Sequence, residues 1–157
     1  SKRLSATWFE DDGFATILQL KEENIGFAAP PNWEEMTKTK PDGEMRALGP
    51  LDPSIYDREI TKAIFDYDYA WEVYKKPQDR IWGYYVFPLL YEGRPIGRME
   101  AKYEKKSKNL KFFNLNLEED VKLDNRGEGA LSRMLERWQN MLDAEESEVD
   151  NTFPVST

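Results

Sequence analysis

Apolar residues recur at two different spacings along this chain, and the two spacings separate predicted strands from predicted helices. Alternating apolar positions over residues 14–20 and 24–28 predict two strands that pair as a hairpin. Three further strand-like segments cover residues 83–91, 95–104 and 110–117, with short polar turns between them. Strands that follow one another across short turns pair antiparallel, so these segments predict a β-meander.

The predicted meander strands differ in which of their faces is apolar. Residues 83–91 carry apolar side chains on both faces, which is typical of a strand covered on both sides. The strand over 95–104 alternates, and we expect it to have one wet face, made of Arg98, Glu100, Lys102 and Glu104. In the last strand the residues expected to point inward are Phe113, Leu115 and Leu117. Shorter strands are predicted at Met45–Leu48 and around Trp71 and Val73.

Three segments show helical spacing or a helix-start signal. Asp52 is the predicted N-cap of a helix over Pro53–Phe65, since a proline at the first helical position has no N–H to lose. A short helix over Trp33–Lys38 is predicted after Asn32. The clearest helix has apolar residues every three or four positions, which predicts that one face packs on the sheet. Its stripe comprises Leu131, Met134, Leu135, Trp138, Met141 and Leu142.

These elements predict an α+β fold, an antiparallel β-meander with packed helices, and composition narrows the chemistry that the fold can carry. The 157 residues suit one domain, and they include neither cysteine nor histidine. Disulfides, thiolate zinc sites and imidazole bases are therefore excluded, and no metal or cofactor site is predicted. The lack of cysteine fits a reducing cytoplasm. No apolar run approaches the ~20 residues that span a bilayer, so no membrane partner is expected.

Charge is unevenly distributed along the chain. The whole carries −8, but residues 75–111 contain ten basic and four acidic residues, a net of +6. This segment is also rich in Tyr and Trp, and contact with nucleic-acid phosphates is predicted here. The alternative is a solvated hairpin whose Lys and Arg side chains keep an edge strand from pairing with other chains.

Six segments in a particular order carry a likeness to a known family. They are Leu-Gly-Pro-Leu-Asp-Pro at 48–53, Tyr-Asp-Arg at 56–58, Phe-Asp-Tyr-Asp-Tyr at 65–69, Glu-Val-Tyr at 72–74, Arg-Ile-Trp-Gly-Tyr-Tyr-Val-Phe-Pro at 80–88 and Arg-Pro-Ile-Gly-Arg at 94–98. Over about residues 44–145 the chain resembles the C-terminal region of winged-helix DNA glycosylases of the AlkZ/YcaQ type. The strands before residue 44 would then fit the end of a winged-helix unit.

The resemblance implies a cytoplasmic DNA-repair protein that removes alkylated or crosslinked bases by hydrolysing the N-glycosidic bond, without a metal. The family positions its water with a Gln-x-Gln or Gln-x-Asp motif in its N-terminal part. Neither Gln19-Leu20-Lys21 nor Gln78-Asp79 matches that motif. We therefore expect a non-catalytic C-terminal fragment, an expectation that the start at Ser1 suits. Its expected partners are double-stranded DNA, through the full-length protein, and the missing N-terminal winged-helix domains.

The same reasoning divides the chain into three parts. Residues 1–43 are predicted to end a winged-helix-like unit with its wing hairpin, and residues 44–145 to form the antiparallel sheet and the C-terminal helix. Residues 146–157 are acidic at first and then lose all periodicity, so they are predicted to form a flexible tail.

One set of side chains is predicted to contact DNA. Arg and Lys would contact phosphates, and an exposed Tyr, or Trp82, would stack on a displaced base. The candidates are Lys75, Lys76, Arg80, Tyr84, Arg94 and Arg98. For Trp82, Tyr84 and Tyr85 the alternative is the core, because their predicted strand is apolar on both faces. For Asp52, and for Asp57 with Arg58, the alternative is a helix cap with an ion pair.

Two other functions stay open at this level. The sheet and its amphipathic helix would also suit a protein-interaction or dimerisation module that does not bind DNA. Paired carboxylates would suit glycoside hydrolysis, although adjacent acids in a charged chain are usually solvated. Such pairs are Asp66 with Asp68, and Glu118 with Glu119 and Asp120. Salt separates the first two functions, since phosphate contacts weaken steeply as salt rises whereas apolar docking hardly changes.

Overall fold

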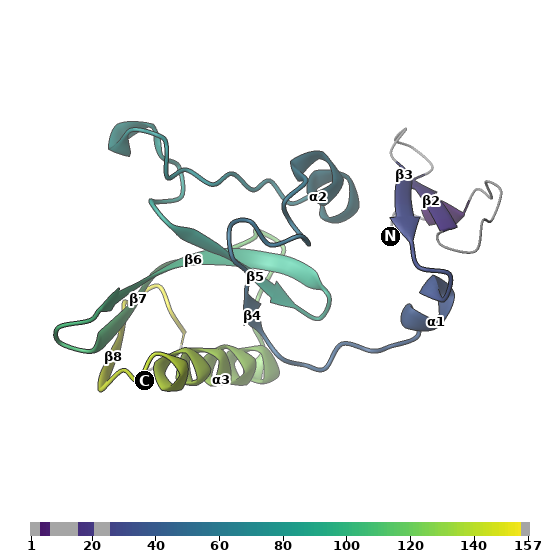
Figure 1. Cartoon of the computed structure of the whole chain (residues 1–157). Coiled ribbons are helices and arrows are strands. Elements are labelled where there is room, and N and C mark those ends of the chain that lie inside the picture. Colours follow the sequence, from purple (N-terminus) through teal and green to yellow (C-terminus); the bar gives the residue numbers. More distant parts are fainter. Residues whose placement is uncertain (1–3, 7–15, 21–25, 155–157) are drawn as a thin grey trace.

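The meander predicted from the alternating segments forms the centre of a five-stranded sheet (Figure 1). Its strands β5 (Val86–Tyr91), β6 (Arg94–Glu104) and β7 (Asn109–Leu117) pair antiparallel in that order. β4 (Arg46–Ala47) pairs antiparallel with β5, and β8 (Glu146–Val149) pairs parallel with β7. The structure, a computed structural model, describes residues 4–6, 16–20 and 26–154, and its strands and helices confirm the α+β class.

A smaller antiparallel sheet comes first in the chain. It consists of β1 (Leu4–Ala6), β2 (Thr16–Leu20) and β3 (Gly26–Ala29) in that order. The pairing of β2 with β3 confirms the predicted hairpin strands, while the predicted turn between them lies outside the described residues. α1 (Trp33–Met36) follows at the predicted place, but the Asn32 side chain makes no cap hydrogen bond. The assignment of this part to a winged-helix unit stays a prediction.

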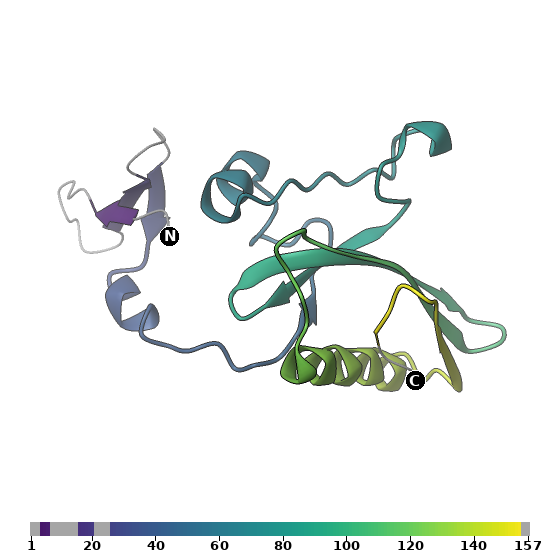
Figure 2. The ribbon, with the colours of Figure 1, turned by 180° about the vertical axis from the view of Figure 1, so that it is seen from behind.

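One face of the large sheet is covered by α3 (Asn125–Met141), as Figures 1 and 2 show from opposite sides. Asp124 begins this helix, because its side chain accepts a hydrogen bond from the Gly127 N–H at 2.8 Å. The predicted apolar stripe is confirmed for the buried core but fails at Met141, which is exposed at the end of the helix. Core residues between helix and sheet include Met99, Leu110, Phe112, Leu131, Met134 and Leu135.

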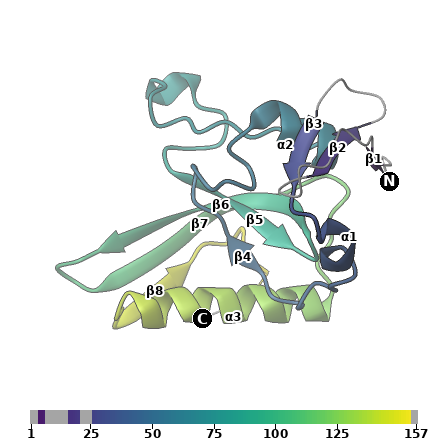
Figure 3. The same ribbon diagram turned by 45° about the vertical axis from the view of Figure 1, so that its right-hand side comes forward.

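The opposite face of the sheet is covered by the segment that precedes β5 (Figure 3). This segment holds α2 (Arg58–Phe65) and a short 3₁₀ turn, η1 (Pro77–Asp79). The predicted helix start at Pro53 is wrong, since the side chain of Asp57 caps α2 through the Ile60 N–H. Asp52 instead accepts a hydrogen bond from the Ser54 N–H within a turn. No strand forms around Trp71 and Val73, where a short strand was predicted.

This second covering layer corrects the predicted wet face of β6. Arg98 and Glu100 are buried, Glu104 is half-buried, and only Lys102 of the polar row is exposed. The alternation of the strand is correct, but its polar row faces a protein layer rather than water. That layer has its own small core of Leu48, Ile55, Tyr67 and Tyr69.

The inward residues of β7 also differ from the prediction. Pairing with β6 is irregular between Arg98 and Glu100, and Asn114 has a φ of 53°. The irregularity places an extra residue in β7, which shifts the alternation by one position. Phe112 and Leu115 therefore both reach the buried core, whereas Phe113 is only half-buried.

Part of the segment predicted to be a flexible tail forms a strand and contacts the core. β8 continues the sheet, and Phe153 is buried against Phe112 with ring centroids 6.4 Å apart. A strand with one apolar residue in four carries little sequence signal, so it was missed. The proposed division of the chain at residues 43 and 145 stays a prediction. Within the described residues, the helices are too short or too polar to cross a bilayer.

Candidate functional site

The loop Ile81–Tyr85 is held from below by two buried glutamates. Glu72 is 1% exposed, and its Oε2 accepts hydrogen bonds from the backbone N–H groups of Ile81 at 2.9 Å and Trp82 at 2.7 Å. A longer contact of 3.4 Å reaches the same oxygen from the Gly83 N–H. One carboxylate oxygen therefore receives three successive backbone donors.

Glu100 holds the second half of this loop. Its Oε1 accepts hydrogen bonds from the N–H groups of Tyr84 at 2.8 Å and Tyr85 at 3.2 Å. Its Oε2 accepts one from Nδ2 of Asn114 in β7 at 2.8 Å. Five successive N–H groups, from Ile81 to Tyr85, thus point toward two carboxylates inside the fold.

Gly83 permits this close approach of the loop to Glu100. Its φ of 139° is a conformation that side chains with a Cβ rarely adopt, and an added Cβ would lie 2.4 Å from the Glu100 Cδ. The contact between the loop and Glu100 therefore requires a glycine at position 83.

Several large side chains of the loop are exposed, as is Tyr74, which contacts Trp71 as Tyr85 does, whereas Trp82 is half-buried. Tyr74 is 88% exposed, Ile81 is 73% exposed and Tyr84 is 54% exposed, with Tyr85 beside them. We call these four residues the aromatic ridge. Large exposed apolar side chains that lie close together are typical of a binding surface.

Basic residues flank the aromatic ridge. The guanidinium carbon of Arg80 lies 4.7 Å from the centroid of the Tyr84 ring, and its Nε donates to the backbone oxygen of Lys75 at 3.1 Å. Lys75 Nζ donates to Oε1 of Glu72 at 2.8 Å, and Lys76 is exposed. Four of the six predicted DNA-contact residues therefore lie in one segment: Lys75, Lys76, Arg80 and Tyr84.

A chain of aromatic contacts connects the ridge to the core. Trp71 meets Tyr74 and Tyr85 edge-on, with ring centroids 5.6 Å and 5.8 Å apart. Tyr85 contacts Phe87, which in turn contacts Trp138 of α3 at 5.0 Å. The ridge is thus anchored on the sheet and on the helix behind it.

Hydrogen bonding keeps Glu72 ionised. Burial by itself would raise the pKa of this carboxyl, but the Lys75 ammonium and the N–H groups of Trp82, Ile81 and Gly83 outweigh the effect of burial, so the pKa is lowered.

Burial raises the pKa of Tyr69 to about 12, and this hydroxyl donates to the Val86 carbonyl oxygen at 3.0 Å. The phenol therefore stays neutral and serves as a tie to β5.

Arg98, the fifth candidate, lies inside the fold and not on the ridge. It is 2% exposed, and its Nη2 donates to Glu118 at 2.5 Å while its Nη1 donates to the backbone oxygen of Asp68 at 3.0 Å. Its guanidinium also lies over the rings of Tyr67 and Trp82. In this position it can fix Trp82, but its charge is already paired.

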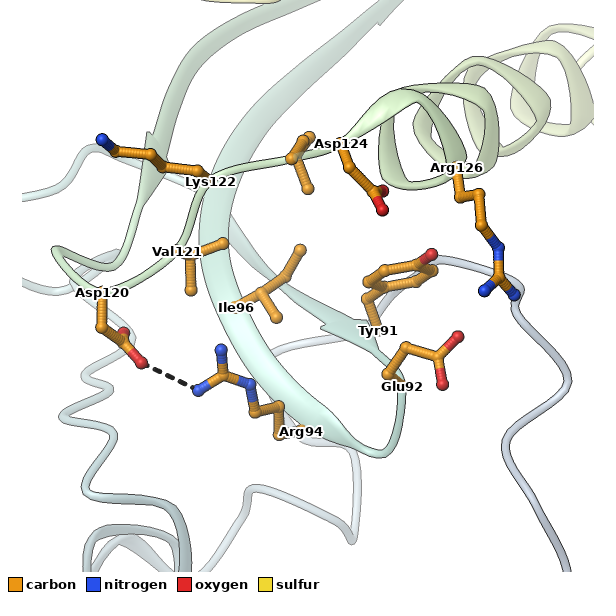
Figure 4. A pocket seen from close by; sticks show the side chains of 10 residues that line it. Tyr91, Glu92, Arg94, Ile96, Asp120, Val121, Lys122, Asp124 and Arg126 are labelled. Carbon is orange, nitrogen blue, oxygen red and sulfur yellow. Dashed lines mark hydrogen bonds and ion pairs between the residues drawn. The ribbon is translucent and has the colours of Figure 1, made fainter.

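Arg94, the sixth candidate, lies at the turn between β5 and β6. Figure 4 shows it pointing toward Asp120, to which its Nη1 donates at 3.0 Å. The pocket around it is about 300 Å³ and lies between this turn and the start of α3. Its charged lining is balanced, with Glu92, Asp120 and Asp124 against Arg94, Lys122 and Arg126.

A second cavity of about 460 Å³ has Arg94 and Trp82 among its lining residues. Its walls are rich in carboxylates: Asp66, Glu118, Glu119 and Asp120. Asp66 and Glu118 belong to the carboxylate pairs considered from the sequence, and both line this cavity. The acidic wall disfavours an anion such as phosphate.

Ion pairs neutralise much of the basic segment 75–111. Lys108 pairs with Asp143 and Glu145, and their carboxylates raise its pKa. Lys111 pairs with Glu148 of β8 at 3.5 Å. Acidic residues near the C-terminus thus neutralise Lys108 and Lys111 of the β6–β7 hairpin. Among the described residues, no ion pair engages Lys76, Arg80, Lys105 or Lys106.

The two glutamates were missed as site residues by the sequence reasoning. Glu72 lies in one of the segments that carry the family likeness, but nothing in its neighbourhood indicates burial. Glu100 belongs to an alternating polar row, which predicts contact with water. In the part of the chain that the structure describes, no three acidic side chains gather as a metal site would require.

The chain was also compared with known proteins. The family model for DNA glycosylase AlkZ-like proteins matches residues 3–141, which is most of the chain. The chain therefore belongs to the AlkZ-like DNA glycosylase family. This match confirms the resemblance seen in residues 44–145 and extends it through the N-terminal strands. No solved structure matches the chain.

Proposed function

We propose that this chain contributes DNA contact and architecture to a DNA glycosylase that excises alkylated or crosslinked bases. Membership of the AlkZ-like family supports the process, and the exposed, basic aromatic ridge supports the surface. The ridge is the observation on which the proposal depends, because it combines unburied aromatic rings with two cations that are not engaged in ion pairs within the described chain.

Each side chain of the ridge segment has a proposed role. Lys76 and Arg80 contact backbone phosphates, which gives sequence-independent and salt-sensitive binding. Tyr84 stacks on a base that has left the duplex, an interaction of about 1–3 kcal/mol. Lys75 shares its charge between Glu72 and the DNA. Phosphate contact by Arg94 and Arg98, predicted from the sequence, stays untested, and the proposal does not depend on it.

The proposal assigns no hydrolytic step to this chain. The family's Gln-x-Gln or Gln-x-Asp pair is absent from the sequence, as are histidine and cysteine. The expected result is that this polypeptide alone releases no base from an alkylated duplex. Release of a base at a rate above that of the DNA alone would show that its own residues perform the hydrolysis.

Binding to a labelled duplex at low salt tests the DNA-contact proposal. The double variant Lys76→Ala/Arg80→Ala removes two cations beside the ridge and is expected to weaken binding several-fold. The log-log salt slope is expected to fall by about 2, because each phosphate contact contributes about 0.9. Lys105→Ala/Lys106→Ala is the matched control, since these exposed lysines also lack ion pairs in the described chain but lie in the β6–β7 turn. Equal weakening by both variants would contradict the proposal.

A protein-interaction role is the second candidate, and an exposed apolar surface around α2 favours it. Leu51, Tyr56, Ile64 and Phe65 are all exposed there. Apolar docking on this surface would be nearly independent of salt. Self-association that Tyr56→Ser and Phe65→Ser abolish, measured by sedimentation in high salt, would support this role, and a monomer at all concentrations would exclude dimerisation.

A further inference from the structure

Glu72 and Glu100 lie beneath the aromatic ridge and are buried from water. We propose that they are positioning residues, which preset the Ile81–Tyr85 loop so that Tyr84 can stack on an unpaired DNA base. The inference rests on the DNA-contact role proposed above, and it adds the residues that fix the conformation of the contacting loop.

The first argument is the hydrogen bonding of the loop backbone. Residues 81–85 belong to no helix or strand, so no ladder of the sheet satisfies their N–H groups. The two carboxylates accept all five of these donors. Without the carboxylates these donors would have to turn toward water, and the loop would lose its present shape.

The second argument is the origin of the two acids. Glu72 precedes the loop in the chain, whereas Glu100 belongs to β6 and is fixed in turn by Asn114 of β7. The loop is therefore tied to the rigid centre of the sheet and not only to its own neighbours. Gly83 is the residue that allows the backbone to reach Glu100.

The third argument is the division between the inside and the outside of the loop. The backbone donors of the loop point inward to the carboxylates, whereas the side chains of Ile81 and Tyr84 are exposed. A surface that is ordered before binding loses less conformational freedom when it binds. An exposed tyrosine on a preset backbone is suited to stacking on a base.

The fourth argument is electrostatic. A buried carboxylate is weak evidence for stability, since apolar residues of similar size often stabilise a core as well or better. Two buried acids under one exposed loop are better explained by the shape that they impose on it. Among the residues that the structure describes, Lys75 alone forms an ion pair with Glu72, while Glu100 is held by neutral donors.

Amide hydrogen exchange of the folded chain without DNA tests the positioning itself. In Glu72→Ala and Glu100→Ala, exchange at residues 81–85 is expected to rise by about tenfold or more relative to the parent. Asp124→Ala is the control, because it removes a carboxylate that caps α3 and does not touch the loop. Glu100→Gln keeps an oxygen for the two N–H groups and is expected to preserve partial protection. Protection of β6 and β7 amides confirms that each variant is folded.

A duplex with one unpaired 2-aminopurine reports the consequence for stacking. The parent is expected to quench the fluorescence of the 2-aminopurine. Tyr84→Ala and Glu100→Ala are expected to lose this quenching and to weaken binding by about threefold to tenfold. Asp124→Ala is expected to retain the quenching. Loop exchange in Glu100→Ala and Glu72→Ala equal to that in Asp124→Ala would overturn the positioning. A parent that binds no duplex would instead overturn the proposed function, and the exchange result would still decide whether the glutamates hold the loop.

Discussion

The guanidinium carbon of Arg98 lies 4.0 Å from the ring centroid of Trp82. The same group lies 4.6 Å from the Tyr67 ring, and it also donates to Glu118 and to the backbone of Asp68. Arg98 of β6 thus connects the sheet to the layer that covers it. Trp82 is held twice, by this cation at its ring and by Glu72 at its backbone N–H.

Replacement of Arg98 by alanine is expected to destabilise the fold by about 3 kcal/mol, because a buried and paired cation is lost beneath two aromatic rings. Arg98→Lys keeps the charge but cannot reproduce the two-armed contact with Glu118 and Asp68. Urea denaturation measures both variants. Arg94→Ala is the control, since it breaks only an exposed ion pair with Asp120, which is worth about 0–1 kcal/mol. Similar losses for Arg98→Ala and Arg94→Ala would contradict the structural role of Arg98.

Gly83→Ala is expected to destabilise the chain by at least about 1–3 kcal/mol, because the positive φ strains any residue with a Cβ and the new methyl group would overlap the Glu100 carboxyl. Thermal unfolding, followed by circular dichroism, measures the loss. Gly49→Ala is a matched control, since nothing lies within 4 Å of its added Cβ. An unfolding temperature for Gly83→Ala as high as that for Gly49→Ala would show that the loop does not contact Glu100 in this way.

Ionisation of Glu72 is expected to make the folding stability depend on pH below about 4.5. Its pKa in the folded state is below the ordinary value of 4.5, so the group stabilises the fold at pH values above about 4.5. This contribution is lost as the pH falls through the lowered folded pKa. Comparison of the parent with Glu72→Gln in urea at pH 6 and pH 3 is expected to show a stability difference that shrinks toward low pH. A difference that is constant or grows on acidification would contradict the lowered pKa.

Truncation of Phe153 tests whether the C-terminal segment belongs to the fold. This side chain is buried against Phe112, and Phe153→Ala is expected to reduce the free energy of unfolding by about 3 kcal/mol. Phe65→Ala serves as the comparison, because Phe65 is exposed on α2. If both variants unfold at the same urea concentration, the segment after β8 is a flexible tail as its sequence predicts.

Elements with a strong local signal were predicted well. The strands β5, β6 and β7 follow from alternation and short turns, and α3 follows from its apolar stripe. Family membership was accessible too, because six ordered segments carried it. These features depend on residues that are close in the sequence.

Features that depend on tertiary packing were not predictable in the same way. The alternation of β6 places Arg98 and Glu100 on one face, but it cannot show that the segment before β5 covers that face. The extra residue at Asn114 changes the inward set of β7 without any proline or glycine to mark it. Of the six candidate DNA-contact residues, Arg94 and Arg98 lie away from the ridge, where they pair with Asp120 and Glu118, and their contact with DNA stays a prediction.

Residue-resolved NMR of the parent chain, titrated with a short duplex that contains an unpaired base, tests the central claim most directly. The account predicts that amide shifts change across residues 74–85, that saturation weakens steeply with salt, and that amides of the β6–β7 turn near Lys105 and Lys106 stay unchanged. Shift changes confined to α2 or to the β6–β7 turn, or no change at any residue at low salt, would contradict it.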